Sequence, residues 1–290
     1  MAKTVIITGA NGFLGTQLVK HFSGQGWHVR ALVREPQKHI STRQLTYLAY
    51  DLTKSLNPDI FKGADYLVHA AYIKHDKHHP HASELNIDAA KQLLAASRVH
   101  NLKKNVFISS MSAHAEAVSV YGKHKFAIEK LFNTSADISL RPGLIIGNGG
   151  IVRTMVAFMK TKHVVPLMGG GKQPVQIIGR DDLVQAIDTA LVTKVSGVLT
   201  IAHPKVLTYK QFYQTISKQL GIKVVFVPVP YHAVLAGLTI ASKLPLPLGI
   251  GPDNLRGLRK LQSVDNHADL EQLHLKLMTL EKCLQKTTLH

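Results

Sequence analysis

The sequence predicts an α/β protein in which a doubly wound parallel sheet is followed by a smaller lobe, and three observations lead to this prediction. Short apolar runs alternate with amphipathic stretches of helical period through residues 1–150, as in a parallel sheet with crossover helices. A glycine-rich turn joins the first apolar run to the first helical stretch. After Gly150 the alternation loosens, so residues 151–290 are expected to form mostly the smaller lobe, with a segment near 175–202 returning to the sheet domain.

Six strands are expected in the first half, each a short run rich in β-branched, aliphatic or aromatic residues. They are Thr4–Thr8, Trp27–Val33, Leu45–Ala49, Tyr66–Ala71, Asn105–Ser110 and Asp137–Arg141. Apolar residues at helical spacing predict three helices. These are Thr16–Gly24, Ala82–His100 and Tyr121–Phe132. Ligands of such a sheet bind at the carboxyl ends of its strands, so the functional residues are expected there.

The second half is expected to contain fewer regular elements. They are a loop at Pro166–Gly171, a helix at Asp181–Val192, a strand at Val198–Ala202, a helix at Tyr209–Leu220 and a strand at Val224–Val229. The Thr208 hydroxyl precedes one of these helices and is expected to cap its first N–H groups. Residues 251–290 are expected to be mostly helical.

Composition indicates an ordinary globular protein, with 45% hydrophobic and 18% charged residues. Cys283 is the one cysteine, so no internal disulfide forms and a reducing, cytoplasmic location is expected. No signal peptide is expected. The apolar stretch 233–246 contains Lys243 and Pro245 and is too short to span a bilayer. It is interpreted as a core helix, with a membrane-surface segment or a pocket wall as alternatives.

The net charge of +17 raises the question of a nucleic-acid partner. Residues 1–150 contain 18 Lys and Arg against 10 Asp and Glu, and residues 151–290 contain 17 against 8. The excess is spread over both halves without a dense basic run, whereas DNA-binding proteins usually concentrate it on one element. No nucleic-acid partner is expected, and the charge is interpreted as a general attraction for anionic cofactors and substrates.

The turn after the first strand has the glycines and the position of a dinucleotide-binding site, although its spacing is not the commoner G-x-G-x-x-G. It reads Thr8-Gly9-Ala10-Asn11-Gly12-Phe13-Leu14-Gly15, a G-x-x-G-x-x-G pattern between strand and helix. Glycines let the backbone turn tightly and approach a pyrophosphate, and the helix N-terminus offers N–H groups to it. The expected cofactor contacts of this turn are Gly9, Asn11, Gly12, Phe13, Leu14 and Gly15.

The end of the second strand indicates which dinucleotide binds. Arg34 and Glu35 follow this strand. An arginine there pairs with the 2′-phosphate of NADP, whereas an acidic residue binds the free 2′-hydroxyl of NAD. NADP(H) is therefore favoured, with NAD(H) as the alternative. Asp51 and Leu52 follow the third strand and are expected beside the adenine, the alternative for Asp51 being a capping role.

Tyr121 and Lys125 form the expected chemical centre. Their Y-x-x-x-K spacing places both on one helix face, shortly after a strand ending Ile108-Ser109-Ser110. A nearby ammonium favours the phenolate and lowers a tyrosine pKa from about 10 toward neutrality. Such a tyrosine donates or accepts a proton at working pH.

These motifs occur in the order of a known family. Residues 1–150 contain TGANGFLG, DLT, HAA, LNIDAAKQLL, FISS, YGKHK and LRPGLIIG. The chain resembles a short-chain dehydrogenase/reductase of the extended or atypical kind, often labelled NAD-dependent epimerase/dehydratase. SAHAEAVSVYGKHK and PDNLRGLRKLQSVDN resemble the branch that includes the accessory subunit of respiratory complex I. The resemblance implies a dinucleotide-binding Rossmann domain at 1–150 and a substrate-binding lobe after it.

The resemblance also implies roles for matching residues. Tyr121 would be the general acid/base, and Lys125 would bind the nicotinamide ribose. Ser110, or Ser112 in its place, would position a substrate carbonyl or hydroxyl. Asn86 would serve as a structural or proton-relay residue. Further implied cofactor contacts are Ala70, Ala71 and Pro142.

The expected activity is hydride transfer between a nicotinamide and a small-molecule carbonyl or hydroxyl. The alternatives are a sugar-nucleotide epimerase or dehydratase, and a non-catalytic NADPH-binding structural or sensor protein. Helices 82–100 and 121–132 would form the dimer interface common in this family, and both a monomer and a homodimer are compatible with the sequence. One loop carries side chains that bind zinc, but no closed zinc motif, so no metal is expected; it contains His75, Asp76, His78, His79 and His81.

Overall fold

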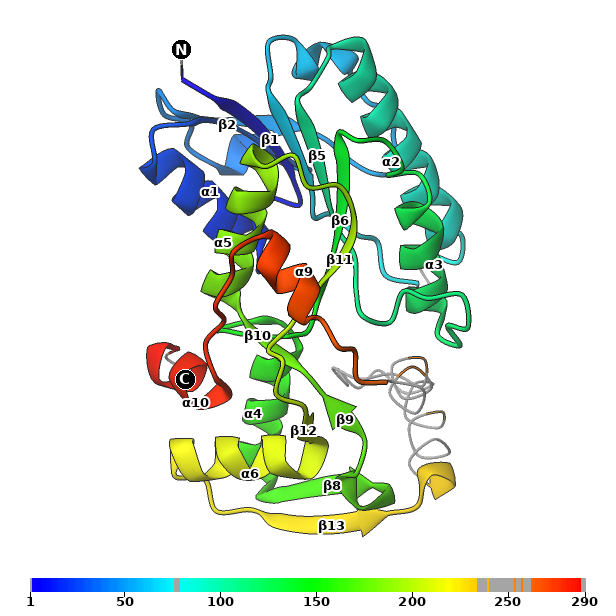
Figure 1. Ribbon diagram of the computed structural model, residues 1–290, viewed down its shortest axis with the longest axis vertical. Helices are drawn as coiled ribbons and strands as arrows, with labels where there is room; N and C mark the ends of the chain where they lie inside the picture. Colours follow the sequence, from blue (N-terminus) through cyan, green and yellow to red (C-terminus); the bar gives the residue numbers. More distant parts are fainter. Residues whose placement is uncertain are drawn as a thin grey trace. The chain divides into compact units, whose positions relative to one another are not determined.

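The computed structural model describes residues 2–75, 79–233, 239, 253, 257 and 262–287. The chain divides into two compact units (Figure 1). The first comprises residues 1–113, 124–141 and 184–199, and the second comprises residues 114–123, 142–183 and 200–290. Each unit has its own hydrophobic core.

A seven-stranded sheet belongs to the first unit, apart from the last residues of two of its strands. The strands are β1 (Thr4–Thr8), β2 (His28–Val33), β3 (Leu45–Ala49), β4 (Tyr66–His69), β5 (Lys104–Ile108), β6 (Asp137–Pro142) and β11 (Gly197–Ile201). Their order is β11-β6-β5-β4-β1-β2-β3, and the described pairings from β3 to β6 are parallel. The predicted Rossmann-type sheet is therefore confirmed, and its order reverses between β1 and β4, the switch point at which such folds bind ligands.

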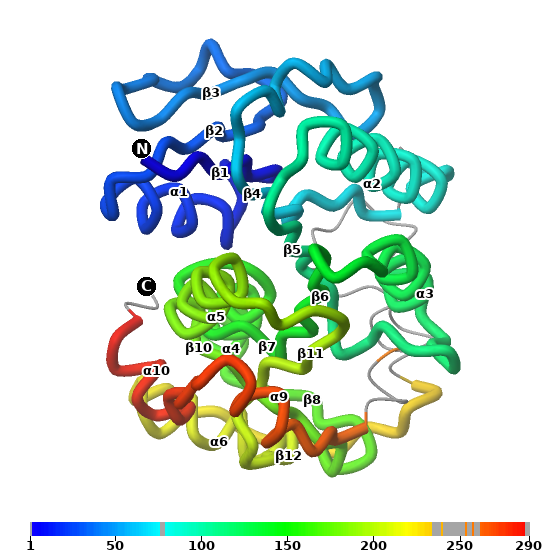
Figure 2. Tube along the Cα trace, turned by 45° about the horizontal axis from the view of Figure 1, so that its top comes forward, coloured from blue at the N-terminus to red at the C-terminus, as the bar shows by residue number. Residues whose placement is uncertain are grey.

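Helices cover both faces of this sheet. They are α1 (Gly15–Gly24) and α5 (Arg180–Val192) on one face, and α2 (Ala82–Val99) and α3 (Val120–Glu129) on the other (Figure 2). In the first pair, His21 Nε2 lies 2.8 Å from Asp188 Oδ2. Because both faces are covered, the three central residues of β1 are all apolar, and Val5, Ile6 and Ile7 are fully buried.

The second unit contains short sheets and helices. Its elements are β7 (Leu144–Ile146), α4 (Gly150–Lys162), β8 (Val164–Met168), β9 (Pro174–Val175), β10 (Ile177–Gly179), β12 (Leu207–Thr208), α6 (Tyr209–Leu220), β13 (Val225–Val229), α9 (His267–Gln272) and α10 (Leu280–Lys286). The strands pair as β7 with β10, β9 with β12, and β8 with β13. In the part of the chain that the structure describes, no helix has the length and apolar character needed to cross a membrane.

Most expected elements are present, with ends that differ by at most three residues. Thr208 caps α6 as predicted: its Oγ1 accepts a hydrogen bond from Gln211 N at 3.1 Å, and the Gln211 side chain accepts one from Thr208 N at 2.8 Å. This reciprocal pair is a capping box.

Three expectations for the second unit were wrong or incomplete. The segment Pro166–Gly171 was expected as a loop, but β8 continues through Pro166 to Met168, and only Gly169–Gly171 forms a 3₁₀ turn. Pro166 is exposed in this two-stranded sheet, where a strand tolerates a missing N–H. The helix α4 was not predicted. In 262–287 only α9 and α10 are helical, so this part of the C-terminal segment is less helical than expected.

Candidate functional site

The glycine turn between β1 and α1 is shaped by close backbone contacts. Gly9 has a φ of +68°, and a Cβ at Gly9 would lie 2.9 Å from the Ala71 backbone. A Cβ at Gly15 would lie only 2.0 Å from the Gly9 carbonyl oxygen. Gly12 N donates a hydrogen bond to Gly9 O at 2.9 Å. Gly9 and Gly15 therefore leave no room for a side chain, and α1 begins directly against the end of β1.

The N-terminus of α1 has the character of an anion-binding site. Leu14 precedes the helix and makes no side-chain cap hydrogen bond, and the first turn contains no acidic residue. The first N–H groups of a helix lack intrahelical partners and carry a partial positive charge. Asn11 and Gly12 are exposed in the turn that leads to them, and Phe13 is half-buried. This turn can hold a pyrophosphate.

Thr8 fixes the end of β4 beside this turn. Its Oγ1 accepts hydrogen bonds from Ala70 N and Ala71 N, both at 3.1 Å, and lies 2.8 Å from His69 Nδ1. Burial lowers the pKa of His69 to about 3, so the ring is neutral. Because both N–H groups occupy the lone pairs of Thr8, its proton goes to Nδ1, and His69 is protonated on Nε2. These bonds also explain why β4 ends at His69 rather than at Ala71.

The ends of β2 and β3 carry the residues expected near adenosine. Arg34 and Glu35 are exposed, and Glu35 Oε1 lies 2.7 Å from Lys38 Nζ. Asp51 Oδ1 accepts hydrogen bonds from Thr53 N at 2.9 Å and Thr53 Oγ1 at 2.8 Å. These bonds, with the positive charge of Arg34, lower the pKa of Asp51. Asp51 thus caps its own turn, and Leu52 beside it is half-buried.

Lys125 is buried in the first unit, at 3% exposure. Its Nζ donates to Ile108 O at 2.7 Å and lies 4.7 Å from the Phe107 ring centre and 4.8 Å from that of Tyr72. Burial lowers the pKa of Lys125 to about 7, while the nearby charge of Glu129 acts in the opposite direction. The side chain is therefore poised to change its charge near neutral pH.

A buried carboxylate lies one helical turn beyond Lys125. Glu129 accepts a hydrogen bond from Ser109 Oγ and forms a bidentate pair with Arg141, with Nε–Oε1 at 2.8 Å and Nη2–Oε2 at 2.5 Å. Ser109 directly precedes Ser110, so this network holds the end of β5 against α3. Glu129 was not expected in the site, although Tyr121, Lys125 and Glu129 follow one another at four-residue spacing.

Lys125 leads to a testable pH dependence. The folded pKa of about 7 is below the usual 10.5, so between these values the unfolded chain binds a proton that the folded chain does not. Unfolding free energy should therefore rise with pH in this window, by roughly 1 kcal/mol per pH unit. Lys125→Met should remove this contribution. Urea unfolding of both proteins from pH 7 to pH 9 measures it, and parallel pH curves for the two would contradict the prediction.

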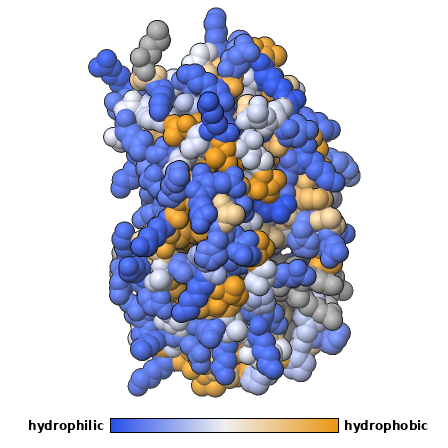
Figure 3. Space-filling model, viewed as in Figure 1, coloured by the Kyte–Doolittle hydropathy of each residue, from blue (hydrophilic) through white to orange (hydrophobic). Residues whose placement is uncertain are grey.

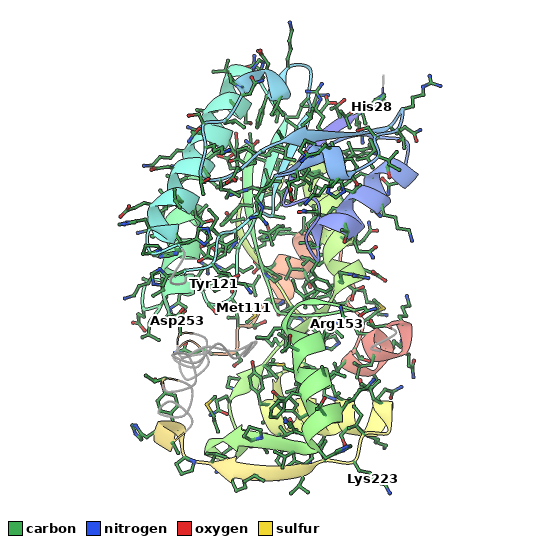
Figure 4. The ribbon with its side chains drawn as sticks, turned by 180° about the vertical axis from the view of Figure 1, so that it is seen from behind. His28, Met111, Tyr121, Arg153, Lys223 and Asp253 are labelled. Atoms are coloured by element: carbon green, nitrogen blue, oxygen red, sulfur yellow. The ribbon has the colours of Figure 1, made fainter. Side chains whose placement is uncertain are left out.

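Tyr121 lies in the first turn of α3, half-buried. Asp253 caps this turn: its Oδ1 accepts from Val120 N at 2.8 Å and its Oδ2 from Tyr121 N at 3.3 Å (Figure 4). A carboxylate at a helix N-terminus is stabilising. Asp253 is part of the PDNLRGLRK segment, in which the sequence analysis assigned no residue a role, because a cap 132 residues away has no local signal.

Two other expected residues of the first unit have defined partners. Ser110 Oγ accepts a hydrogen bond from Ser112 N at 3.1 Å. Asn86 is buried, and its amide bonds the backbone of Ile73 at 2.9 and 2.8 Å and Ala82 O at 2.6 Å. Asn86 thus ties the chain after β4 to α2, which favours the structural role over the proton relay.

A second polar pair lies beside Lys125. Tyr72 Oη lies 3.1 Å from His124 Nδ1, and His124 is buried. Tyr72 follows Ala71 directly, so the end of β4 and α3 meet here through both a hydrogen bond and the contact of Lys125 with the Tyr72 ring. Neither residue was expected to form a pair from the sequence, because only the fold brings Tyr72 and His124 together.

In the second unit, the chain after β6 is closely packed. Pro142 ends β6, and a Cβ at Gly143 would lie 2.6 Å from Gln176 O. Leu144 N donates to the same oxygen at 2.8 Å. The glycine after Pro142 therefore allows β7 to pair beside β10 without a steric clash.

The histidine loop is only partly described, since Asp76 and His78 lie outside the described residues. Among the residues that are described, no group of three or more His, Cys, Asp or Glu is placed to hold a metal ion.

Comparison with known sequences shows the family. The model of the NAD dependent epimerase/dehydratase family matches residues 5–202. Ceramide reductase from Caulobacter vibrioides is 31% identical over 150 residues, which are 50% of this chain and 47% of the reductase. This match therefore spans about half the length of either protein. The protein y4nG from Sinorhizobium fredii is 24% identical over 274 residues, covering 86% of this chain and 69% of y4nG.

Solved structures share the fold over nearly the whole chain. MoeE5 in complex with UDP-glucuronic acid and NAD has a TM-score of 0.75 at 20% identity, covering 98% of this chain and 97% of the other. UDP-glucose 4-epimerase from Thermotoga maritima with UDP-glucose has a TM-score of 0.75 at 17% identity, with coverages of 98% and 97%. At these identities the likeness shows the fold alone, whereas the family model covers more than half of the chain. The chain therefore belongs to the NAD-dependent epimerase/dehydratase family, a family of enzymes.

Proposed function

We propose that the protein is an NADP(H)-dependent oxidoreductase that reduces a small-molecule carbonyl, or oxidises the matching hydroxyl. The observation that carries this proposal is the buried Lys125, four residues after Tyr121 on α3. Its pKa of about 7 means that burial of this amine costs stability. Packing alone gives no reason for a lysine here, whereas acid–base chemistry requires a group of this kind.

The proposed mechanism assigns one task to each residue. Bound nicotinamide supplies the hydride. Tyr121 gives its hydroxyl proton to the substrate oxygen, and the Lys125 ammonium favours the phenolate that remains. Lys125 also donates a hydrogen bond to the nicotinamide ribose. Ser110, or Ser112, donates a hydrogen bond to the substrate oxygen and so positions it.

The proposed cofactor site uses the glycine turn and the ends of β4 and β6. The turn from Gly9 to Gly15 and the N-terminus of α1 take the pyrophosphate. Ala70 and Ala71 present small side chains to the cofactor. Pro142, at the end of β6, is proposed to contact the nicotinamide, and residues 151–290 are proposed to contain most of the substrate-binding residues.

Arg34 is proposed to select NADP(H) over NAD(H). Its guanidinium is exposed at the end of β2 and suits a phosphate dianion. Arg34→Ala should weaken NADPH binding by about tenfold or more, the magnitude of a lost charge-assisted hydrogen bond. NADH binding should change less than about threefold. Fluorescence titration with both cofactors measures this, using Arg43→Ala as a control for the loss of one exposed arginine. Equal losses for NADPH and NADH would contradict the assignment.

The proposed activity is tested by following nicotinamide oxidation with a panel of aldehydes and ketones, aliphatic and aromatic. NADPH-dependent reduction of at least one carbonyl, with the alcohol identified as product, is the expected result. Tight NADPH binding without turnover of any carbonyl or nucleotide sugar would instead indicate a non-catalytic cofactor-binding protein, the alternative suggested by the resemblance to the complex I branch.

A second candidate is a sugar-nucleotide epimerase or dehydratase. Two structural neighbours contain UDP-glucuronic acid or UDP-glucose, and this specific observation favours it. An epimerase oxidises and re-reduces one substrate, so it consumes no net cofactor. Incubation with UDP-glucose and a trace of NAD distinguishes the two: a new sugar isomer without net nicotinamide reduction would establish the epimerase. The match to ceramide reductase, although confined to half of each chain, favours carbonyl reduction.

A further inference from the structure

The second unit contains long segments without acidic residues. Residues 142–180 and 200–233 contain no Asp or Glu. Their basic residues are Arg153, Lys160, Lys162, Lys172, Arg180, Lys205, Lys210, Lys218 and Lys223. The acidic residues of the second half of the chain cluster in 181–188 and after residue 252. The net charge of the whole half therefore does not reveal these purely basic segments. These segments themselves therefore carry a net positive charge.

Part of this basic charge gathers where α4 ends and β13 begins. Val225 N donates to His163 O at 2.9 Å, and His163 Nδ1 lies 3.1 Å from Lys223 O. These bonds bring the end of α4, with exposed Lys160 and Lys162, beside exposed Lys223. Lys223 lies at the end of the second unit that carries β13 (Figure 4).

Apolar side chains are exposed among these lysines. Val225 is 63% exposed and Val227 39%; alternate residues of a strand share a face, so both point the same way. Phe158 of α4 is 43% exposed and lies one turn from Lys162. Figure 3 shows hydrophobic residues among hydrophilic ones at the lower end of the view, where β13 lies. We call this surface the β13 corner; it consists of Phe158, Lys160, Lys162, Lys223, Val225 and Val227.

We propose that the β13 corner docks on an anionic lipid bilayer. Exposed apolar side chains among lysines, with no acidic residue near them in the sequence, complement a surface that has anionic headgroups and an apolar interior. Each lysine close to such a surface strengthens binding roughly fivefold, so three lysines contribute about a hundredfold. The phosphates of a nucleic acid would also attract the lysines, but they would offer no apolar partner to the exposed valines of β13. A bilayer therefore fits this surface better than a nucleic acid.

The proposal is tested by sedimentation of the full-length protein with vesicles. One set contains phosphatidylcholine alone, and the other contains phosphatidylcholine with phosphatidylglycerol. Binding to the anionic vesicles that weakens with added salt, and little binding to the neutral ones, is expected. The variant Lys160→Glu/Lys162→Glu/Lys223→Glu should lose about a hundredfold or more in binding. A control with the same charge change on the first unit, Lys20→Glu/Lys54→Glu/Lys62→Glu, should lose much less.

A second variant separates the contribution of the apolar side chains, which would insert into the bilayer, from that of the charges. Val225→Ser/Val227→Ser should weaken binding to anionic vesicles severalfold at unchanged net charge, with an unaltered thermal unfolding curve. Equal losses for the two lysine variants would show a response to net charge alone and overturn the proposal. Unchanged binding of the valine variant would overturn it as well. So would duplex DNA that binds more tightly than the vesicles in the same salt and depends on the same three lysines, since the partner would then be a nucleic acid.

Discussion

Tyr121→Phe is expected to abolish turnover, with kcat reduced by about a hundredfold to ten-thousandfold. The substitution removes one oxygen atom, the group that is proposed to give its proton to the substrate. The aromatic ring and the backbone N–H that donates to Asp253 both remain. Affinity for NADPH should therefore change less than about threefold, because the glycine turn, α1 and Arg34 are untouched. Steady-state rates and a cofactor titration of the same preparation measure both quantities.

The control for Tyr121→Phe is a tyrosine remote from the proposed chemistry. Tyr213 on α6 is packed against Tyr209 and Phe212, and burial raises its pKa to about 12. Tyr213→Phe should retain nearly full activity. A Tyr121→Phe variant with the wild-type rate would remove the proposed general acid, whereas equal losses in both variants would indicate damage to folding.

Glu129→Gln is expected to destabilise the protein by about 3–5 kcal/mol, the cost of breaking a buried ion pair from one side. Glu129 is 4% exposed and accepts hydrogen bonds from Ser109 and Arg141. The neutral amide leaves the Arg141 charge without its partner. It also removes the negative charge that raises the pKa of Lys125, so that pKa should fall further below 7. Urea unfolding measures the stability, and the pH dependence of kcat reports the lysine.

Two further variants separate the ion pair from general damage. Glu84→Gln removes an exposed carboxylate of α2, whose Oε2 lies 3.3 Å from His81 Nδ1, and should change stability by less than about 0.5 kcal/mol. The double variant Glu129→Gln/Arg141→Met removes both charges and should recover part of the stability lost by Glu129→Gln. A double variant that is less stable than Glu129→Gln would mean that Arg141 acts independently of Glu129.

The elements that sequence pattern predicted well are those whose cause is local. β1 is a run of buried apolar residues next to glycines, and α6 begins at a hydroxyl cap followed at the third residue by Gln211. The residues that make up such a signal lie within a few positions of each other, so the signal can be recognised without knowing the rest of the fold. α4 was missed because Gly149 precedes it and Gly150 is its first residue, and glycines there suggest a continuing loop. Its buried residues nevertheless follow helical spacing: Val152, Met155, Val156 and Met159.

The candidate site divides in the same way. The positions of the glycine turn and of the Tyr121–Lys125 pair follow from spacing along the chain. The partners that define their chemistry do not: Thr8 and His69 are 61 residues apart, and Asp253 is 132 residues from Tyr121. A single carboxylate or hydroxyl leaves no periodic pattern in the sequence. Its distance from a hydrogen-bond partner is set by the packing of strands and helices, which come together only when the chain folds.

Local sequence was therefore sufficient for the α/β class, the glycine turn and the helix that carries Tyr121, since steric and helical constraints act over a few residues. The tertiary structure decided the electrostatics. It buried Lys125 against Phe107 and Tyr72, which lowers the pKa of this amine, and it placed Glu129 where its charge opposes that shift. It also gathered lysines and exposed valines at the β13 corner. Charge state and surface depend on burial and on distances between remote segments, and these exist only in the folded chain.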